Sequence, residues 1–475
     1  MAEKATPDTP APFYAAALQN WNVVSALLKG STALRSEVYL PRHSAETDDA
    51  YQARVSRTFC YRGFRKAVRN VVARVFSKPL TLTADMPDPI KLLCDDIDLE
   101  GRNLDRFARR YFYNALAFGA CYLLVDFTRV EPGATAIADA EARPFFKLIP
   151  ATSLIDAERA TIGGKTVITY ARILETATVR DGYSQRQVRR VRELWPDRFQ
   201  LHEQNEKGEW SIIESGPIAV GGEAWDRVPM VPLVLGEEGL PFEYEPPMMD
   251  VAEKNIELFQ NESDQNNILT FARFPMLAHK GPIPQQQDEK GELVPFQVGP
   301  RTVLSSGDTA GLWYYVEPKG DAIAAGANHI ERLKKELEEL GMMPLLDRVS
   351  SDTFATMALL GSAEAHSAAQ AMANEMRDAI AYALWMLGRW MRIDEVGNVN
   401  VNSDFAMGST RKDDIDALDK ARGRRDISRA TYWEEMQRKG VLSSTFDPKQ
   451  EETRILSEAD DMAATVSEDA EDLAA

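Results

Sequence analysis

Two helical patterns on either side of a largely uncharged break constrain this 475-residue chain most strongly. In the first, over residues 321–341, apolar side chains repeat every seven residues, with a second set three places later. This spacing is typical of a coiled-coil-like seam, and the charged residues around it suit water or a neighbouring copy of the helix. The seam is formed by Ile323, Ile330, Leu333 and Leu337. Gly341 is expected to end this helix.

The second pattern runs from about residue 365 to residue 391 and spaces small and flexible apolar side chains three or four apart. It is much longer than the average globular helix of about 11–12 residues. The Met and Trp side chains on it are expected to form core or subunit contacts rather than a cofactor site. Residues 342–361, between the two patterns, contain several Ser and Thr and predict a loop held between two helical struts.

Length and composition favour a folded chain of several packed units. A length of 475 residues suggests about three of them, and the apolar fraction of 44% is ordinary for globular proteins. Three scattered cysteines without CxxC spacing make a disulfide framework or a thiolate zinc site improbable, and fit a reducing cytoplasm. No signal-peptide pattern and no apolar run of about 18 residues occurs, so a soluble protein without a membrane partner is predicted.

The charge is strongly acidic but unevenly distributed. The formal net charge of −18 argues against a protein whose whole surface grips phosphate. Residues 51–80, however, carry eight cations and no anion, whereas residues from 447 onward carry ten carboxylates. Two interpretations of the cationic segment stay open: a helix face that meets water and acidic neighbours, or a nucleic-acid contact.

Local signals divide the first half of the chain. Residues 1–20 are predicted to be a disordered arm, and residues 51–76 a single basic helix. A helix over residues 104–117 and a buried strand over residues 120–127 follow. Residues 145–234 are mostly β, with strands bounded by turn residues.

Gly163 and Gly164 predict a hairpin turn between β-branched runs, because glycine provides positive φ at both central positions. The Gly164-Lys165-Thr166 sequence also resembles the end of a phosphate-binding loop. That motif needs a glycine where Arg159 stands and a helix where a strand-like run follows. The sequence therefore predicts the hairpin.

Residues 246–271 predict a long helix with a strongly polar second half, which is unsuited to a core. A small β unit lies between this helix and the seam helix, so the two helices are expected to form a stalk that carries a β tip. After the long helix, residues 398–405 alternate like a strand, and a helical C-terminal region follows.

No catalytic motif is visible. Five isolated histidines occur without HExxH pairing, and neither a GxSxG nor a dinucleotide-binding fingerprint is present. The acid clusters at residues 95–98 and 413–416 suit a divalent ion as in nucleases, but more often interact with helix dipoles. The prediction is a protein without catalytic residues, cofactor or bound metal.

The order of these elements resembles the bacteriophage portal family, whose members form the ring at one capsid vertex through which double-stranded DNA enters and leaves. The resemblance covers roughly residues 21–457 and rests on the order and spacing of several stretches together. They are the polar helix into Phe274–Pro275, Tyr-Tyr-Val-Glu-Pro-Lys-Gly at 314–320, Leu340–Gly341, Gly-Ser-Ala-Glu-Ala-His-Ser at 361–367, Asp404–Phe405, Asp-Ile-Ser-Arg-Ala-Thr-Tyr at 426–432 and Lys439–Gly440.

The resemblance implies an α+β fold with an α/β wing, a two-helix stem, a small β clip, a long channel helix and a helical crown. The parts would be the N-terminal arm (1–20), the wing (21–245, with 362–405 returning to it), the stem helices (246–271 and 321–341), the clip (272–320), the channel loop (342–361), the long helix and strand (362–405), the crown (406–457) and an acidic tail (458–475).

The resemblance also implies roles for particular residues. Seven are expected to line a DNA channel: Gln260, Asn266, Arg348, Ser350, Ser351, Asp352 and Thr353. The seam residues Ile323, Ile330, Leu333 and Leu337 are expected to pack the stem within and between subunits. The clip contacts would be Trp313, Tyr314 and Tyr315.

The partners implied are further copies in a twelve-membered ring, double-stranded DNA, a packaging terminase, major capsid and scaffolding proteins, and head-completion adaptor or tail proteins. The expected location is the portal vertex of the virion, after assembly in the host cytoplasm. Two other classes stay open. One is a DNA-processing packaging enzyme such as a terminase-like ATPase or nuclease, and the other is a different oligomeric virion protein.

Overall fold

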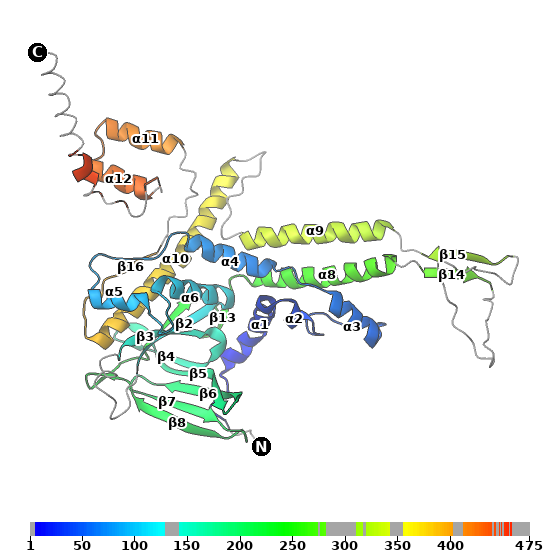
Figure 1. Ribbon diagram of the computed structural model, residues 1–475, viewed down its shortest axis with the longest axis horizontal. Coiled ribbons are helices and arrows are strands. Elements are labelled where there is room, and N and C mark those ends of the chain that lie inside the picture. The colour runs from blue at the N-terminus through cyan, green and yellow to red at the C-terminus, as the bar shows by residue number, and fades with distance from the viewer. Residues whose placement is uncertain are drawn as a thin grey trace, which may run out of the picture. The chain divides into compact units, whose positions relative to one another are not determined.

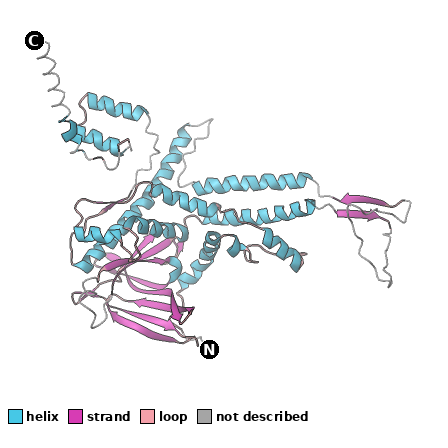
Figure 2. Cartoon of the chain, in the orientation of Figure 1, coloured by secondary structure: helices cyan, strands magenta, loops and turns pink. Residues whose placement is uncertain are grey.

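The chain folds into two units, residues Met1–Ser403 and Asp404–Ala475, and mixes helices with antiparallel sheets (Figures 1 and 2). A computed structural model describes residues 5–128, 142–273, 276–281, 310–316, 320–342, 355–401, 412–438, 441–442, 446, 448, 451–455 and 457. The α+β class predicted from the sequence is therefore confirmed for the described part of the chain.

The centre of the first unit is a three-stranded antiparallel sheet in which β2 (Ala120–Phe127) lies between β3 (Pro144–Pro150) and β11 (Met230–Val234). Six consecutive residues at the start of β2 are buried, as the continuous apolar run predicts. Helix α6 (Leu104–Phe118) leads directly into β2, and α10 (Ala355–Met391) packs on all three strands. The predicted helix and buried strand are thus confirmed.

A second, five-stranded antiparallel sheet follows in simple sequence order. Its strands are β4 (Leu154–Ile162), β5 (Lys165–Asp181), β6 (Ser184–Leu194), β7 (Arg198–Gln204) and β8 (Trp210–Pro217). The turn between β4 and β5 has φ values of 58° at Gly163 and 77° at Gly164. Both central residues therefore have positive φ, which confirms the predicted hairpin and excludes a phosphate-binding loop.

The prediction of a disordered arm over residues 1–20 is wrong for the residues that the structure describes. Helix α1 (Pro12–Lys29) already begins at Pro12. The backbone N–H of Ala11 donates to the carbonyl of Ile155 at 2.8 Å, and Asp8 pairs with Arg189 at 2.9 Å. Composition alone missed this segment because its order comes from contacts with the distant five-stranded sheet.

The single basic helix predicted over residues 51–76 is also wrong. After the short α2 (Ser31–Leu34), the chain forms α3 (Asp48–Arg57) and then α4 (Gly63–Val75). Thr58 leaves the helical conformation with φ −83° and ψ 130°, and its hydroxyl donates to the Arg54 carbonyl at 2.8 Å. A tertiary contact described below holds the connecting segment away from the helical path.

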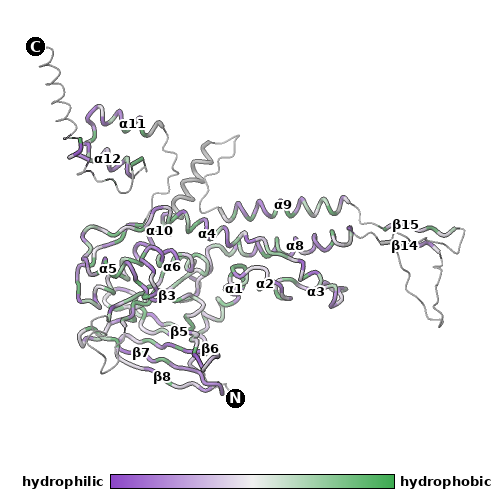
Figure 3. The backbone as a smooth tube through the Cα atoms, viewed as in Figure 1, coloured by the Kyte–Doolittle hydropathy of each residue, from purple (hydrophilic) through white to green (hydrophobic). Residues whose placement is uncertain are grey.

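Two long helices then run side by side in opposite directions, with a β ribbon between them in sequence (Figure 1). They are α8 (Met249–Arg273) and α9 (Gly320–Met342), and the ribbon pairs β14 (Met276–Lys280) with β15 (Leu312–Val316). Hydrophilic residues recur along both helices (Figure 3). The predicted pair of helices is confirmed, although α9 continues through Gly341 instead of ending there.

Helix α10 begins at Ala355, so residues 355–361 of the predicted loop are helical. The small elements of the first unit are β1 (Thr81–Leu82), which pairs with β16 (Val399–Asn400), α5 (Asp88–Asp95), η1 (Ala151–Ser153), β9 (Ala219–Val220), β10 (Glu223–Ala224), β12 (Glu237–Glu238) and β13 (Tyr244–Glu245).

The second unit contains α11 (Lys412–Gly423) and α12 (Arg429–Arg438). The Ser428 hydroxyl accepts a hydrogen bond from the Thr431 N–H at 3.1 Å and so caps α12. The Tyr432 hydroxyl donates to the Asp419 carboxylate at 2.6 Å and joins the two helices.

Candidate functional site

The apolar seam of α9 packs inside the chain, between α4 and α8. Leu333 and Leu337 are each 1% exposed and Ile330 is 8% exposed, whereas Ile323 is half-buried. A Cβ atom added to Gly63 of α4 would lie only 2.2 Å from Leu337 Cδ2. The seam therefore joins helices of one subunit, and contact between subunits through it stays a prediction.

Glycine and alanine let α4 and α9 approach each other at a second point. Gly341 is buried, and a Cβ atom added to it would lie 2.7 Å from the Cβ of Ala67. Two helices can approach this closely only where both carry small residues. This requirement explains why a glycine occurs here, although glycine is unfavourable inside a helix. The sequence predicts that Gly341 ends the helix. This prediction is wrong because a local pattern contains no information about the tertiary contact with Ala67.

Polar side chains connect the outer edges of α8 and α9. Lys334 pairs with Glu262 at 3.0 Å, and Lys254 pairs with Glu336 at 3.4 Å. The Gln265 side-chain amide donates to the Ile323 carbonyl at 2.9 Å. These contacts fix the register of the two helices, although each half-exposed ion pair contributes only about 0–1 kcal/mol.

Asn255 on α8 holds the segment that separates α3 from α4. Its side chain is fully buried, its Oδ1 accepts from the Phe64 N–H at 2.8 Å, and its Nδ2 donates to the Tyr61 carbonyl at 2.8 Å. Without Asn255, the Phe64 N–H and the Tyr61 carbonyl would lack these hydrogen-bond partners in an apolar environment. The break in the predicted basic helix is therefore stabilised by a residue far away in the sequence.

The cation Arg54 lies in the core between α3 and α8. Its guanidinium contacts both carboxylate oxygens of Glu46, at 2.7 and 2.8 Å, and lies 3.4 Å from the Ser263 hydroxyl. The side chains of Arg54 and Glu46 are 2% and 7% exposed. Hydrogen bonds from Arg54 lower the pKa of Glu46 from 4.5 to about 2.

Other cations of the basic segment have protein partners too. Lys66 pairs with Glu338 at 3.2 Å, and the guanidinium of Arg57 donates to the Thr270 hydroxyl at 3.0 Å. Of the two interpretations given above, these contacts favour the helix face that meets acidic and polar neighbours.

The structure describes two of the seven predicted channel residues, both on α8. Gln260 is half-buried, and its side-chain amide donates to the Tyr39 carbonyl at 2.9 Å. Asn266 is exposed and lies six residues further along the helix. The other five, Arg348, Ser350, Ser351, Asp352 and Thr353, lie outside the described residues. A lining role for these seven residues stays a prediction.

The three predicted clip residues lie on β15, in the ribbon between α8 and α9. Tyr314 and Tyr315 are 47% and 59% exposed, and Trp313 packs against His279 with ring centroids 4.5 Å apart. Exposed aromatic side chains are typical of interaction surfaces. Their role as docking contacts stays a prediction.

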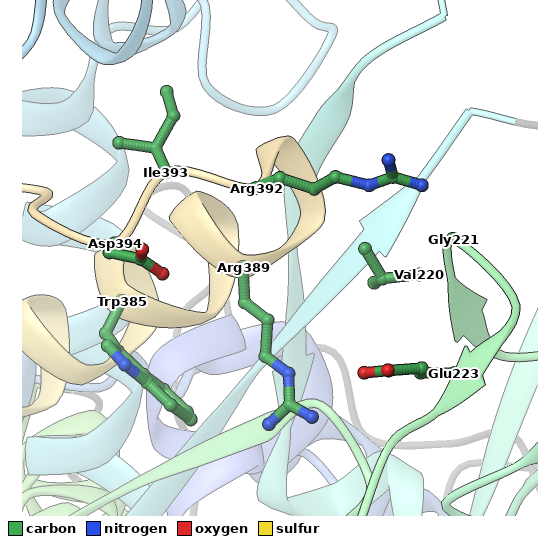
Figure 4. Close-up of a pocket in the computed structure, with 8 residues that line it drawn as sticks. All are labelled: Val220, Gly221, Glu223, Trp385, Arg389, Arg392, Ile393 and Asp394. Carbon is green, nitrogen blue, oxygen red and sulfur yellow. The ribbon is translucent and has the colours of Figure 1, made fainter.

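A cavity of about 630 Å³ lies at the C-terminal end of α10, beside the β9–β10 turn (Figure 4). Its lining includes Gly221, Glu223, Trp385, Arg389, Arg392 and Asp394. The guanidinium of Arg389 lies 4.8 Å from the Trp225 ring and 5.9 Å from the Trp385 ring, and pairs with Asp226 at 3.6 Å. The sequence predicts core or subunit contacts for this end of the helix, and Trp385 and Arg389 are spaced as neighbours on one helical face.

In the acid cluster at residues 95–98, the carboxylates of Asp96 and Asp98 have protein partners. Asp98 accepts the backbone N–H of Glu100 at 3.0 Å and pairs with Arg102 at 2.6 Å, while Asp96 pairs with Arg143 at 2.7 Å. Across the part of the chain that the structure describes, no group of three His, Cys, Asp or Glu side chains is placed to bind a metal ion. Within the same part, no helix is long and apolar enough to cross a membrane.

Comparison with known proteins gives a family match over part of the chain and remote structural likenesses. Residues 247–391 match the model of a domain of unknown function, DUF4055. No curated protein matches the chain. This match covers α8, the β ribbon, α9 and α10, which places the helices of the stalk and the long helix in one recurring sequence unit.

The solved structures that resemble the chain include "Neck of native GTA particle computed with C12 symmetry", at 15% identity and a TM-score of 0.37, covering 78% of this chain and 88% of that one. A second is "Virion of native gene transfer agent (GTA) particle", at 14% identity and a TM-score of 0.35, covering 83% and 89%. These TM-scores are too low to establish a common fold.

Proposed function

We propose that the chain is a portal-type virion protein, whose copies form a ring around a passage for double-stranded DNA. One observation carries the proposal. The pair α8 and α9 encloses the β14–β15 ribbon in sequence, and the 37-residue α10 then returns to the central sheet. This order of wing, stem, clip, channel helix and wing is the one that the family resemblance implies.

Charge supports a passage rather than a DNA clamp. Each phosphate that a protein neutralises contributes about 0.9 to the logarithmic salt slope of binding, so a cationic bore would retain DNA. The chain carries a formal net charge of −18, and Arg54 and Lys66 of its most basic segment are paired with carboxylates. Acidic subunits whose cations are paired in this way allow DNA to move along the passage.

In this proposal the exposed tyrosines of β15 belong to the clip, where the packaging terminase docks and later the head-completion adaptor or tail proteins. The wing faces the major capsid and scaffolding proteins. The ring has twelve members in the particle and occupies the portal vertex of the virion. The chain itself performs no catalysis, and the motor supplies the energy for packaging.

Negative-stain imaging and native mass spectrometry of the purified chain test the proposal directly. We expect closed rings with an axial hole. Discs or filaments without a hole would instead indicate another oligomeric virion protein, and a compact monomer at all concentrations would overturn the assembly. Nucleotide hydrolysis assayed on the same sample, with and without duplex DNA, tests the packaging-enzyme alternative, and turnover by the purified chain would contradict the portal assignment.

A variant of the seam is an unsuitable probe of the ring. Leu337→Asp would place a carboxylate in the packing of α4 against α9 and unfold the subunit itself, because that side chain is buried within one chain. Exposed residues of α9 such as Glu331 and Lys335 are better probes, since they are free of the seam. Their double charge reversal is expected to leave the fold intact and to weaken a stem contact between copies.

A further inference from the structure

The β5–β6 ribbon extends beyond the sheet to which it belongs. The ladder between β6 and β7 covers Arg190–Leu194, whereas β5 and β6 remain paired as far as Asp181 and Ser184. The turn at the end of the ribbon consists of Gly182, with φ 59°, and Tyr183. Tyr183 is fully exposed, although a tyrosine side chain carries a large apolar surface.

Charged side chains of both signs flank this aromatic ring. Arg180 and Asp181 precede the turn, Arg186 follows it, and all three are exposed. The tip therefore presents a ring, a carboxylate and guanidinium groups within a few residues, on a ribbon whose backbone is already ordered. Little conformational entropy would be lost when such a preorganised tip binds.

The cavity at the end of α10 offers the complementary groups. Arg389 and Arg392 present guanidinium groups, Glu223 and Asp394 present carboxylates, and Trp385 contributes an indole (Figure 4). Arg389 contacts two tryptophan rings and pairs with Asp226, and these contacts favour one orientation of its guanidinium. Guanidinium groups bind carboxylates through paired N–H donors, and tyrosine packs well on indole.

Arg392 occupies a backbone position that disfavours most side chains. It follows the last residue of α10 with φ 58°, in the left-handed region where glycine or asparagine is usual. Its guanidinium lies against Gly221, where an added Cβ atom would be 2.2 Å from Nη2. An arginine at this position is unfavourable for the backbone, and the glycine opposite leaves room for its guanidinium.

The tip and the cavity lie at opposite ends of the five-stranded sheet. Successive strands run antiparallel, so the end of β8 lies far from the β5–β6 turn. The segment after β8 stays at that far end, where the Ile218 N–H donates to the Asp197 carbonyl at 2.7 Å. Two unlike surfaces on opposite ends of one subunit give a head-to-tail contact, the kind that generates rings.

We propose that the β5–β6 tip of one copy inserts into the cavity at the end of α10 of the next copy. Asp181 then binds the arginines of the cavity, Arg180 binds its carboxylates, and the Tyr183 ring packs on Trp385. This inference rests on the proposed ring and identifies one of its contacts. Duplex DNA fits the cavity less well, because the carboxylates of Glu223 and Asp394 repel closely spaced phosphates.

Charge reversal tests the contact between Asp181 and Arg392. Asp181→Arg and Arg392→Asp each place like charges together, and each is expected to raise the concentration for half-assembly about tenfold or more, measured by mass photometry. The double variant restores opposite charges and is expected to assemble like the unaltered chain. Because Asp181 and the cavity that Arg392 lines lie at opposite ends of the five-stranded sheet, such restoration requires contact between copies.

Lys207→Asp, at the neighbouring exposed β7–β8 turn, is the matched control and is expected to leave assembly unchanged. Circular dichroism melts of all variants verify that each one folds. Rings that form equally well from both single variants would overturn the contact while leaving the portal proposal in place. If only Arg392→Asp impairs assembly, or if it changes DNA retention alone, the cavity takes another occupant and the inference is wrong. Failure of the unaltered chain to form rings would overturn the proposed function itself.

Discussion

Asn255 shows how one side chain can set the path of a distant segment. Its amide satisfies the carbonyl of Tyr61 and the N–H of Phe64, in the interval between α3 and α4. We predict that Asn255→Leu lowers the free energy of unfolding by about 2–4 kcal/mol, because two buried backbone groups lose their partners. Urea unfolding followed by tryptophan fluorescence measures this loss.

Asn261→Ala provides the comparison. Its side-chain amide donates to the Glu257 carbonyl within the same helix at 2.9 Å, and the residue is only half-buried. The expected cost is at most about 1 kcal/mol, since water replaces this bond. Equal losses for the two variants would mean that Asn255 does not hold the interhelical segment.

The pair formed by Glu46 and Arg54 predicts an acid-sensitive contribution to stability. The pKa of Glu46 falls from 4.5 to about 2 on folding, so its stabilisation is fully present above pH 4.5 and is lost as the pH falls toward 2. We expect about 2–3 kcal/mol from this group. Glu46→Gln should be less stable at pH 7 and should show a shallower decline between pH 4.5 and 2 in urea titrations. An unchanged decline would contradict the assignment.

The contact between helices α4 and α9 depends on small residues. Gly341→Ala is expected to lower the free energy of unfolding by about 1–3 kcal/mol, because the new methyl group meets the Cβ of Ala67. Combining Gly341→Ala with Ala67→Gly should lower the free energy of unfolding by less than the sum of the losses caused by the two single substitutions. A double-mutant cycle by chemical denaturation measures this coupling, and strictly additive effects would show that the helices do not touch there.

Elements encoded by local patterns were predicted well. The seven-residue repeat located α9, and Gly163 and Gly164 located a turn, because both signals are carried by neighbouring residues. The sequence does not predict the interval after α3, because the distant residue Asn255 stabilises it. It also does not predict the ordered segment before α1, because that segment bonds to the distant carbonyl of Ile155.

The candidate cavity could not be predicted for the same reason. Glu223 is the first residue of β10, whereas Arg389 lies in the last turn of α10 and Arg392 directly follows that helix. No sequence spacing brings these segments together, and only the packing of α10 on the central sheet does so. The clip residues of β15, in contrast, were named from the family resemblance, and the structure places Tyr314 and Tyr315 at the surface.

The acidic charge of the chain predicts weak binding to duplex DNA. We expect assembled rings to bind it with a dissociation constant of about micromolar or weaker at physiological salt, as for nonspecific contacts. Fluorescence anisotropy with labelled duplexes at several salt concentrations measures this affinity. Arg348→Glu should weaken it further if that residue lines the passage. Nanomolar affinity that does not respond to this change would contradict a sliding passage.

The close contacts between α4 and α9 at Gly63 and Gly341 have a mechanical consequence. At Gly63 the Leu337 side chain of α9 lies directly against the backbone of α4, and at Gly341 the Cβ of Ala67 lies directly against the backbone of α9, so both contacts are close. We therefore expect a force that reaches α9 from the β14–β15 ribbon to be transmitted to α4 with little displacement between the two helices, so that they move as one rigid body.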